Sequence, residues 1–295
     1  MSTQPFAALV DEHGRRIPYA ALTAPMRTPE DALTLARLRD QCPLIGFTSY
    51  MDFPAGREPG DELDYGGMCV AWCHCFREPE RYLPHGTRWL RLTHADFLDW
   101  SRVDPNPLPP RGGRDVDFVY VCEKGAWKEQ VKNWRLARRC LPVLTEELGL
   151  RGLLVGRPAV EDLGAAASRL TVRDRVSWAE LMHAFATARF LFVPNELDAC
   201  PRILAEALAA NTAVIVNRRI LGGWHYVNPF TGAFFDDERN VADAVARCFD
   251  QPLSPRRWFT SNYGYLHASR RLAAFMTEVD RSLPACRTLH LVPLT

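Results

Sequence analysis

Two carboxylates, Asp198 and Glu206, stand eight positions apart in the segment NELDACPRILAEALAANTAVIVN, residues 195–217. The apolar strand 190–194 delivers Asp198 to the carboxyl end of a sheet, where α/β proteins bind their ligands. A helix starts at Pro201, and its free N–H groups favour an anion such as phosphate. A carboxylate inside that helix can accept hydrogen bonds from both hydroxyls of a ribose. The segment therefore indicates a site for a diphosphate and sugar hydroxyls; the alternative is a turn-forming Asp198 and a solvent-facing Glu206.

The composition is that of an ordinary globular protein. The 295 residues are 47% hydrophobic and 24% charged, which is enough apolar material for a core in one large domain or two smaller ones. The formal net charge is only +1, so no strong field attracts the chain to nucleic acid or to an anionic membrane. We therefore expect no nucleic-acid partner.

Localisation is predicted from the N-terminus and the cysteines. Residues 1–16 lack the basic start and apolar core of a signal peptide, and no apolar run approaches about 18 residues. The nine cysteines are an odd number, and many lie in strand-like apolar runs, which indicates reduced thiols. We expect a cytoplasmic chain without a transmembrane segment.

The chain divides at residues 103–116, VDPNPLPPRGGRDV, whose four prolines and two glycines exclude a regular helix or central strand. Before it, a capping threonine, a proline and acids in the first turn predict a helix from Thr28 to Asp40. After it, apolar strands alternate with helical patterns, which predicts a parallel sheet covered on both faces. The expected strands are 43–51, 68–76, 85–94, 117–122, 152–156, 190–194 and 213–217, and the expected helices are 127–148 with an interruption at Pro142, 177–188, 201–210, 241–249 and 256–282.

The two carboxylates resemble the Glu-x7-Glu motif in the C-terminal lobe of GT-B glycosyltransferases, specifically the retaining group 1 or GT4-like family. Here D-ACPRILA-E fits the motif with Asp198 in the first place, and VSWAELMHAFATARFLFVPNELD resembles the helix and strand before it. The resemblance covers about 117–250. It implies an α/β fold of GT-B type, with two Rossmann-like lobes whose parallel sheets face a cleft. The implied domains are an abbreviated N-terminal acceptor lobe over 1–105, a C-terminal nucleotide-sugar lobe over 106–255, and a helical segment over 256–295 that crosses back to the first lobe.

The resemblance also implies roles for residues around the motif. Glu206 would bind the ribose of the donor, and Asp198 would contact the donor sugar with a side chain one methylene shorter than usual. Cys200 and Pro201 stand at the helix start, where the donor diphosphate is expected. Thr231 opens TGAFFDD, which resembles the family's Thr-Gly loop near the donor.

Cations for the diphosphate are expected after the first strand of this lobe. In VYVCEKGAWKEQ, Lys128 falls at the spacing of the family's lysine, whereas the family's arginine position is occupied by Glu123. Lys124, one residue further on, is the substitute that we expect, and Arg157 at the end of strand 152–156 could also reach a phosphate. The alternative for each of these cations is a solvated surface position.

His74 is the candidate from the N-terminal part. It ends a strand, MCVAWCHCF, that resembles the family strand whose histidine contacts the donor sugar. Read alone, a histidine between two cysteines on an apolar strand is a core residue. A zinc site with Cys69, Cys73 and Cys75 is not expected, because adjacent strand residues point to opposite faces and no Cys-x2-Cys pair is present.

The predicted function is transfer of a hexose or similar sugar from a nucleoside diphosphate donor, such as a UDP or GDP sugar, to a hydroxyl acceptor. The resemblance implies retention of anomeric configuration, with no bound metal and no other cofactor. Three alternatives stay open: a GT-B sugar-nucleotide epimerase, a non-catalytic sugar- or nucleotide-binding protein, and a glycosyltransferase acting on DNA bases.

Overall fold

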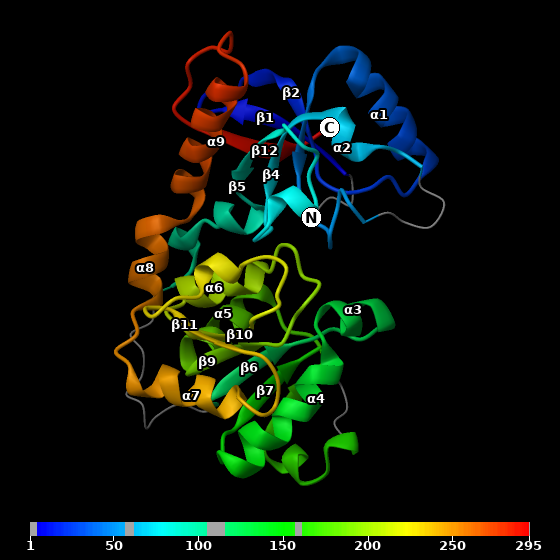
Figure 1. Ribbon diagram of the computed structural model, residues 1–295. Coiled ribbons are helices and arrows are strands. Elements are labelled where there is room, and N and C mark those ends of the chain that lie inside the picture. The colour runs from blue at the N-terminus through cyan, green and yellow to red at the C-terminus, as the bar shows by residue number, and fades with distance from the viewer. Residues whose placement is uncertain (1–4, 57–61, 105–115, 157–160, 295) are drawn as a thin grey trace. The chain divides into compact units, whose positions relative to one another are not determined.

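The computed structural model describes residues 5–56, 62–104, 116–156 and 161–294, which form two compact units (Figure 1). The first unit comprises residues up to Phe97 and those from Tyr263 onward, and the second comprises Leu98–Asn262. Each unit contains its own six-stranded sheet. The α/β class with two sheets is therefore confirmed.

The sheet of the first unit has the strand order β12-β1-β2-β3-β4-β5. The pairs from β2 to β5 are parallel, whereas β1 is antiparallel to both β2 and β12. The three strands predicted from apolar runs are present with shorter bounds, and the first hairpin and the last strand were not predicted. The strands are β1 (Phe6–Asp11), β2 (Arg16–Leu22), β3 (Leu44–Phe47), β4 (Cys69–His74), β5 (Arg88–Arg91) and β12 (Leu289–Pro293).

Helix α1 (Pro29–Gln41) begins where the sequence predicts, because Thr28 and Asp31 form a reciprocal capping box. Helix α9 (Tyr265–Val279) packs against the hydrophobic core of this unit. Its residues Leu272 and Met276 lie among the buried strand residues. The remaining helical turns of this unit are α2 (Tyr65–Met68), η1 (Pro79–Arg81) and η2 (His94–Phe97).

The sheet of the second unit is entirely parallel, in the order β11-β10-β9-β6-β7-β8. The strands β6, β7, β9 and β10 are nearly continuous buried apolar runs, as expected for a sheet covered on both faces, whereas the edge strands β8 and β11 are only partly buried. Because all six strands are parallel, their carboxyl ends lie at one edge. The strands are β6 (Phe118–Val121), β7 (Gly152–Val155), β8 (Leu170–Arg173), β9 (Phe190–Val193), β10 (Ala213–Asn217) and β11 (Gly232–Phe235).

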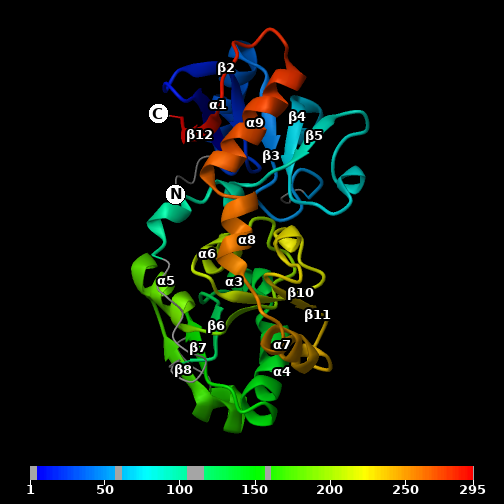
Figure 2. The ribbon, with the colours of Figure 1, turned by 90° about the vertical axis from the view of Figure 1, so that its left-hand side faces the viewer.

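Helices cover both faces of this sheet, with α4 and α7 on one side and α5 and α6 on the other (Figure 2). Their bounds are α3 (Ala126–Val131), α4 (Trp134–Pro142), α5 (Trp178–Thr187), α6 (Arg202–Ala209), α7 (Val241–Asp250) and α8 (Pro255–Asn262), with short turns η3 (Trp100–Arg102), η4 (Val143–Glu147), η5 (Glu161–Arg169) and η6 (Trp224–Tyr226). Among the helices of the described ranges, none combines the length and apolar character that crossing a membrane requires.

Two predicted helices are divided in the structure. The helix expected over 127–148 breaks at Asn133, whose backbone is left-handed with φ 52°, and it changes to a π turn after Pro142. The helix expected over 256–282 breaks at Gly264, whose φ of 103° favours glycine. Residues before this second break belong to the second unit, and α9 belongs to the first.

The hydroxyl of Tyr19 on β2 donates a hydrogen bond to Asp280, 2.9 Å away, just after α9. Burial, followed by the Asp280 carboxylate, raises the pKa of Tyr19 to about 12. The folded state therefore favours the neutral phenol, and this contribution to stability is full below the unfolded pKa of about 10 and is lost as the pH rises toward 12.

Replacement of Tyr19 by Phe is expected to lower the free energy of unfolding by about 1 kcal/mol at pH 8. Chemical denaturation from pH 8 to pH 12 should show wild type and Tyr19→Phe converging at the alkaline end. Tyr82→Phe, which removes the hydroxyl of a half-buried tyrosine, is the control. A constant difference across the range would contradict the assignment.

Candidate functional site

The loop after β9 is fixed by main-chain hydrogen bonds at the carboxyl edge of the parallel sheet. Leu221 N–H donates to the Glu196 carbonyl and Gly222 N–H donates to the Asp198 carbonyl, each at 2.9 Å. The side chain of Asn217, at the end of β10, donates to the Pro194 carbonyl at 3.1 Å. The backbone that carries Asp198 therefore cannot move independently of the segment after β10.

Asp198 lies in this loop as a buried, paired carboxylate. Its Oδ2 atom accepts hydrogen bonds from Lys132 Nζ at 2.6 Å and from Asn195 Nδ2 at 2.8 Å. The Lys132 and Asp198 side chains are 18% and 11% exposed, so water screens this ion pair only weakly. The alternative of a simple turn-forming aspartate is wrong, because the side chain is engaged in a cross-element ion pair.

Glu206 is buried within α6, with 5% of its surface exposed, so the alternative of a solvent-facing helix residue is wrong. Its Oε1 atom accepts a hydrogen bond from Trp178 Nε1 at 3.1 Å and lies 3.6 Å from Arg202 Nη2. Trp178 is the first residue of α5, and Arg202 is the first residue of α6. Both helix starts lie at the carboxyl edge of the sheet, so these donors orient Glu206 at the edge where ligands bind.

Two of the cations predicted to bind the diphosphate are Lys128, on α3, and Lys124, in the segment before α3. Lys128 forms an ion pair with Glu123, 3.2 Å away, and its ammonium group lies 5.1 Å from the Trp127 ring centroid. Lys124 is exposed between Glu123 and α3. The residue at the family's arginine position is therefore a carboxylate that holds the predicted lysine, and the role of both lysines stays a prediction.

The other predicted donor residues have distinct environments. Pro201 precedes the first residue of α6, and Cys200 is half-buried beside it. Thr231 is buried, and its hydroxyl donates to the Tyr226 carbonyl at 2.6 Å and accepts from Asn228 N–H. The Thr231 hydroxyl therefore stabilises the loop 226–231 by hydrogen bonds within that loop. Arg157 lies outside the described residues.

His74 ends β4 in the first unit and is buried. Its ring meets the Trp89 ring edge-on at a centroid distance of 5.0 Å and stacks with Phe76 at 6.3 Å. Its predicted contact with a donor sugar stays a prediction.

Cys69 and Cys73, near His74, are buried, and burial raises the pKa of each thiol. No cluster of three or more His, Cys, Asp or Glu side chains with metal-binding geometry occurs among the described residues.

Three residues of the site escaped sequence reasoning: Lys132, Trp178 and Arg202. The sequence places Asn195 at the carboxyl end of strand 190–194, but its hydrogen bond to Asp198 was not predicted. Lys132 was missed because the predicted helix continues without a break from residue 127 to Pro142. Within that helix Lys128, not Lys132, is the lysine at the family's spacing. The break at Asn133 instead ends α3 and places Lys132 where it reaches Asp198.

Comparison with known proteins places the fold but not the family. No protein-family model and no curated protein matches the sequence. A glycosyltransferase from Rickettsia africae ESF-5 is similar with a TM-score of 0.64 at 12% identity, over 89% of this chain and 77% of that chain. The sucrose-phosphate synthase of Thermosynechococcus elongatus is similar with a TM-score of 0.59 at 15% identity, over 90% of this chain and 74% of that one.

A third similar structure is a pneumococcal O-GlcNAc transferase in complex with UDP and GlcNAc. Its TM-score is 0.56 at 11% identity, and the match covers 85% of this chain but 54% of that one, so the chain spans about half of that protein's length. At these identities the likeness shows the fold alone. That fold is the GT-B type of glycosyltransferases, as the sequence predicts.

Replacement of Lys132 by Met is expected to lower the free energy of unfolding by roughly 2 kcal/mol, because it leaves the Asp198 carboxylate largely buried without its cation. Asp198→Asn in the same chain should recover part of this loss. Urea denaturation of the two single variants and the double variant measures the coupling. Lys124→Met, at an exposed position, is the matched control; an equal loss in the control would refute the buried ion pair.

Replacement of Gly222 by Ala is expected to cost roughly 2 kcal/mol or more, because the added Cβ would lie 1.8 Å from the Ala199 carbonyl oxygen, a backbone atom. The loop that carries Asp198 would have to shift. Gly149→Ala is the control, since its Cβ enters open space and only the left-handed backbone, φ 66°, opposes it. Thermal unfolding of both variants tests the difference, and equal losses would mean that the close approach is not rigid.

Proposed function

We propose that this protein is a glycosyltransferase that moves a sugar from a nucleoside diphosphate donor to a hydroxyl acceptor. The observation that carries the proposal is the pair of buried carboxylates, Asp198 and Glu206, each held by donors at the carboxyl edge of one parallel sheet. Buried, oriented carboxylates at such an edge suit recognition of sugar hydroxyls. The likeness of the fold to glycosyltransferases supports the same activity.

Glu206 is the proposed ligand of the donor ribose. Its carboxylate has about four acceptor positions, and Trp178 and Arg202 use only the Oε1 atom in the contacts described above. These contacts fix the orientation of the carboxylate before the donor arrives. Preorganisation of this kind reduces the entropy lost on binding.

Asp198 is the proposed contact of the donor sugar. Lys132 and Asn195 donate hydrogen bonds to its Oδ2 atom and orient the carboxylate to accept hydrogen bonds from sugar hydroxyls. A negative charge at this place also stabilises the positive charge that develops on the sugar ring as its bond to the diphosphate breaks. His74 is proposed, from the family resemblance, as a second contact of the donor sugar.

The leaving diphosphate carries the largest charge of the proposed reaction. The positive end of the α6 dipole lies at Arg202, whose guanidinium group carries a cation at the same edge, so the helix start and Arg202 can both offset charge on the diphosphate. Lys128 and Lys124 supply two further cations near α3. We propose that transfer proceeds with retention of configuration and without a bound metal, as the resemblance implies.

A second candidate function is favoured by the Lys128–Glu123 ion pair. The carboxylate that replaces the family's arginine holds the predicted phosphate lysine at 3.2 Å and brings negative charge toward the expected diphosphate. A protein that binds nucleotide sugars without transferring them would tolerate that change. Such a protein would bind the donor but would not release the nucleotide from it.

The first experiment is a thermal-shift screen of the full chain against UDP, GDP, ADP and their common sugar conjugates. A ligand that binds only the native state raises the unfolding temperature by mass action. A shift with one nucleotide family supports the donor site and identifies the nucleotide. Release of the nucleoside diphosphate from the shifted sugar conjugate separates the transferase from the non-catalytic candidate, and no shift with any nucleotide would refute both.

Replacement of Glu206 by Ala is expected to weaken binding of the nucleotide that gives the shift by about 1–3 kcal/mol, the cost of losing charged hydrogen bonds to the ribose. Calorimetric titration measures the change, and Glu206→Gln should lose less because it retains one carbonyl acceptor. Glu146→Gln, at an exposed position of η4, is the control. Unchanged affinity in a folded Glu206→Ala variant would remove Glu206 from the donor site.

A further inference from the structure

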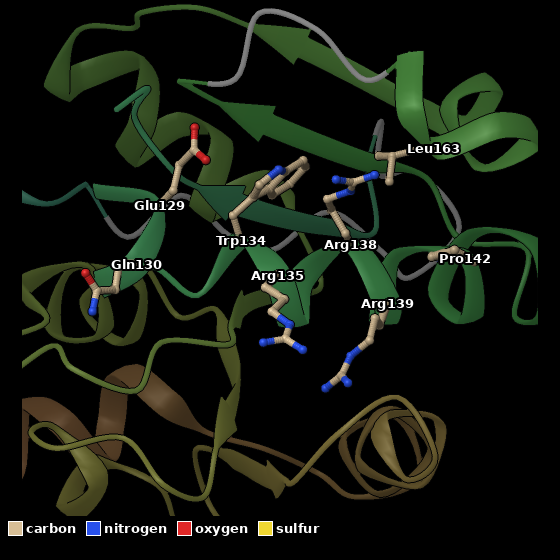
Figure 3. A pocket seen from close by; sticks show the side chains of 8 residues that line it. All are labelled: Glu129, Gln130, Trp134, Arg135, Arg138, Arg139, Pro142 and Leu163. Atoms are coloured by element: carbon tan, nitrogen blue, oxygen red, sulfur yellow. The ribbon is translucent and has the colours of Figure 1, made fainter. Parts of the chain in front are cut away.

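A cavity of about 530 Å³ lies against α3 and α4 of the second unit, and Figure 3 shows the side chains that line it. Its lining includes Trp134 and Pro142 but neither Asp198 nor Glu206. This cavity therefore does not supply the apolar contacts of a ligand at the two carboxylates. Such contacts have to come from side chains exposed beside the carboxylates, and the aromatic side chain that bonds to Glu206 is the partly exposed Trp178.

Trp178 is fixed in position although part of it faces solvent. It is the first residue of α5, and the start of that helix is held by the reciprocal capping box of Ser177 and Glu180. Its Nε1–H donates to the Glu206 carboxylate at 3.1 Å, while 42% of the residue is exposed. Because the backbone and the N–H edge of the indole are both held, the exposed part of the ring is a preorganised aromatic surface.

Glu206 is contacted from two helix starts that differ in chemistry. Trp178 of α5 brings an aromatic ring to its Oε1 atom, and Arg202 of α6 brings a guanidinium group, 3.6 Å from the same atom. A nucleotide carries the same series of groups, which are an aromatic base, a ribose diol and a phosphate. The arrangement therefore matches the base to Trp178, the ribose to Glu206, and the phosphates to Arg202 and the positive end of α6.

The covalent structure of a nucleotide brings its base close to Trp178. The base is attached to C1′ of the ribose, next to the carbon that bears the 2′-hydroxyl. When this hydroxyl donates to Glu206, the base lies within reach of an indole whose N–H bonds to the same carboxylate. Bases of every kind stack on aromatic side chains, because each base has a π-face.

We propose that Trp178 couples recognition of the nucleobase to recognition of the ribose. This inference rests on the proposed function, since it assigns further contacts to the same nucleotide site. The exposed face of the indole stacks on the base, and Nε1–H holds the Glu206 carboxylate in the orientation that accepts the ribose hydroxyls. Trp178 is thus a binding residue for the base and a positioning residue for the ribose contact.

Calorimetric titration of the full chain with UDP, GDP and ADP, with the 2′-deoxy form of each and with ribose 5-phosphate tests the two contacts separately. The preference for a nucleotide over its 2′-deoxy form measures the ribose contact, because only the 2′-hydroxyl differs. Trp178→Phe keeps an aromatic face but lacks the N–H, whereas Trp178→Ala lacks both. The difference between these two variants therefore measures the base contact.

The wild type is expected to prefer the ribose form by at least about tenfold, and Trp178→Phe should lose most of this preference. Trp178→Ala should bind nucleotides at least about fivefold more weakly than Trp178→Phe, whereas both variants should bind ribose 5-phosphate alike. Trp127→Ala, which removes a tryptophan of α3 that is 44% exposed, is the matched control and should keep the preference of the wild type.

The outcomes distinguish this inference from the proposed function. If none of the three nucleoside diphosphates binds the wild type, both are refuted. If at least one binds, the inference alone is overturned by the absence of a ribose preference in the wild type, by an undiminished preference in Trp178→Phe, by equal nucleotide affinities of Trp178→Phe and Trp178→Ala, or by an equal loss in Trp127→Ala. Thermal unfolding shows whether each variant is folded, and Trp178→Leu replaces Trp178→Ala if the alanine variant is not.

Discussion

The ion pair between Lys132 and Asp198 is the interaction on which the geometry of the candidate site depends. It joins the turn between α3 and α4 to the loop after β9, 66 residues further along the chain. That loop is itself fixed to the segment after β10 by main-chain hydrogen bonds. The loops after β9 and β10 and the turn between α3 and α4 are thus connected, and Asp198 is the residue that joins the turn to the loops.

The sequence predicts the elements of this arrangement better than their breaks. The strands β6, β7, β9 and β10 of the second unit are continuous apolar runs that the sequence predicts. The capping residues Thr28 in the first unit and Ser177 in the second mark the starts of α1 and α5 correctly. The left-handed turn at Asn133 could not be read in the same way, because the helical apolar pattern continues through it. Lys132 therefore appeared to be one more polar residue of a long helix, and its role was missed.

The first unit shows a different limit of prediction from the sequence, which is the pairing of segments far apart in the chain. Its strand β1 pairs with β12 from the other end of the chain, and Tyr19 bonds to Asp280 over 261 positions. Local periodicity carries no information on such pairing, so the apolar runs at 43–51 and 68–76 were recognised, whereas β12 was not. The role of His74 depends on a ligand that only binding experiments can place.

The charges at the carboxyl edge are nearly balanced before any ligand binds, which constrains how a diphosphate can be received. Lys128 and Arg202 are 42% and 44% exposed and pair with Glu123 and Glu206. The Lys128–Glu123 pair is exposed on both sides, and such pairs contribute about 0–1 kcal/mol, so Lys128 can turn toward a diphosphate at little cost. The partner of Arg202, Glu206, is buried, so breaking that pair costs more. Lys132 is 18% exposed and its ammonium group lies 2.6 Å from the Asp198 carboxylate. If Lys132 moved away, the largely buried carboxylate would be left without a cation, which is energetically costly. A donor would therefore rearrange the exposed Lys128–Glu123 pair and leave the Lys132–Asp198 pair intact, so that Lys128 turns toward the phosphates while the fixed pair holds the geometry of the sugar site.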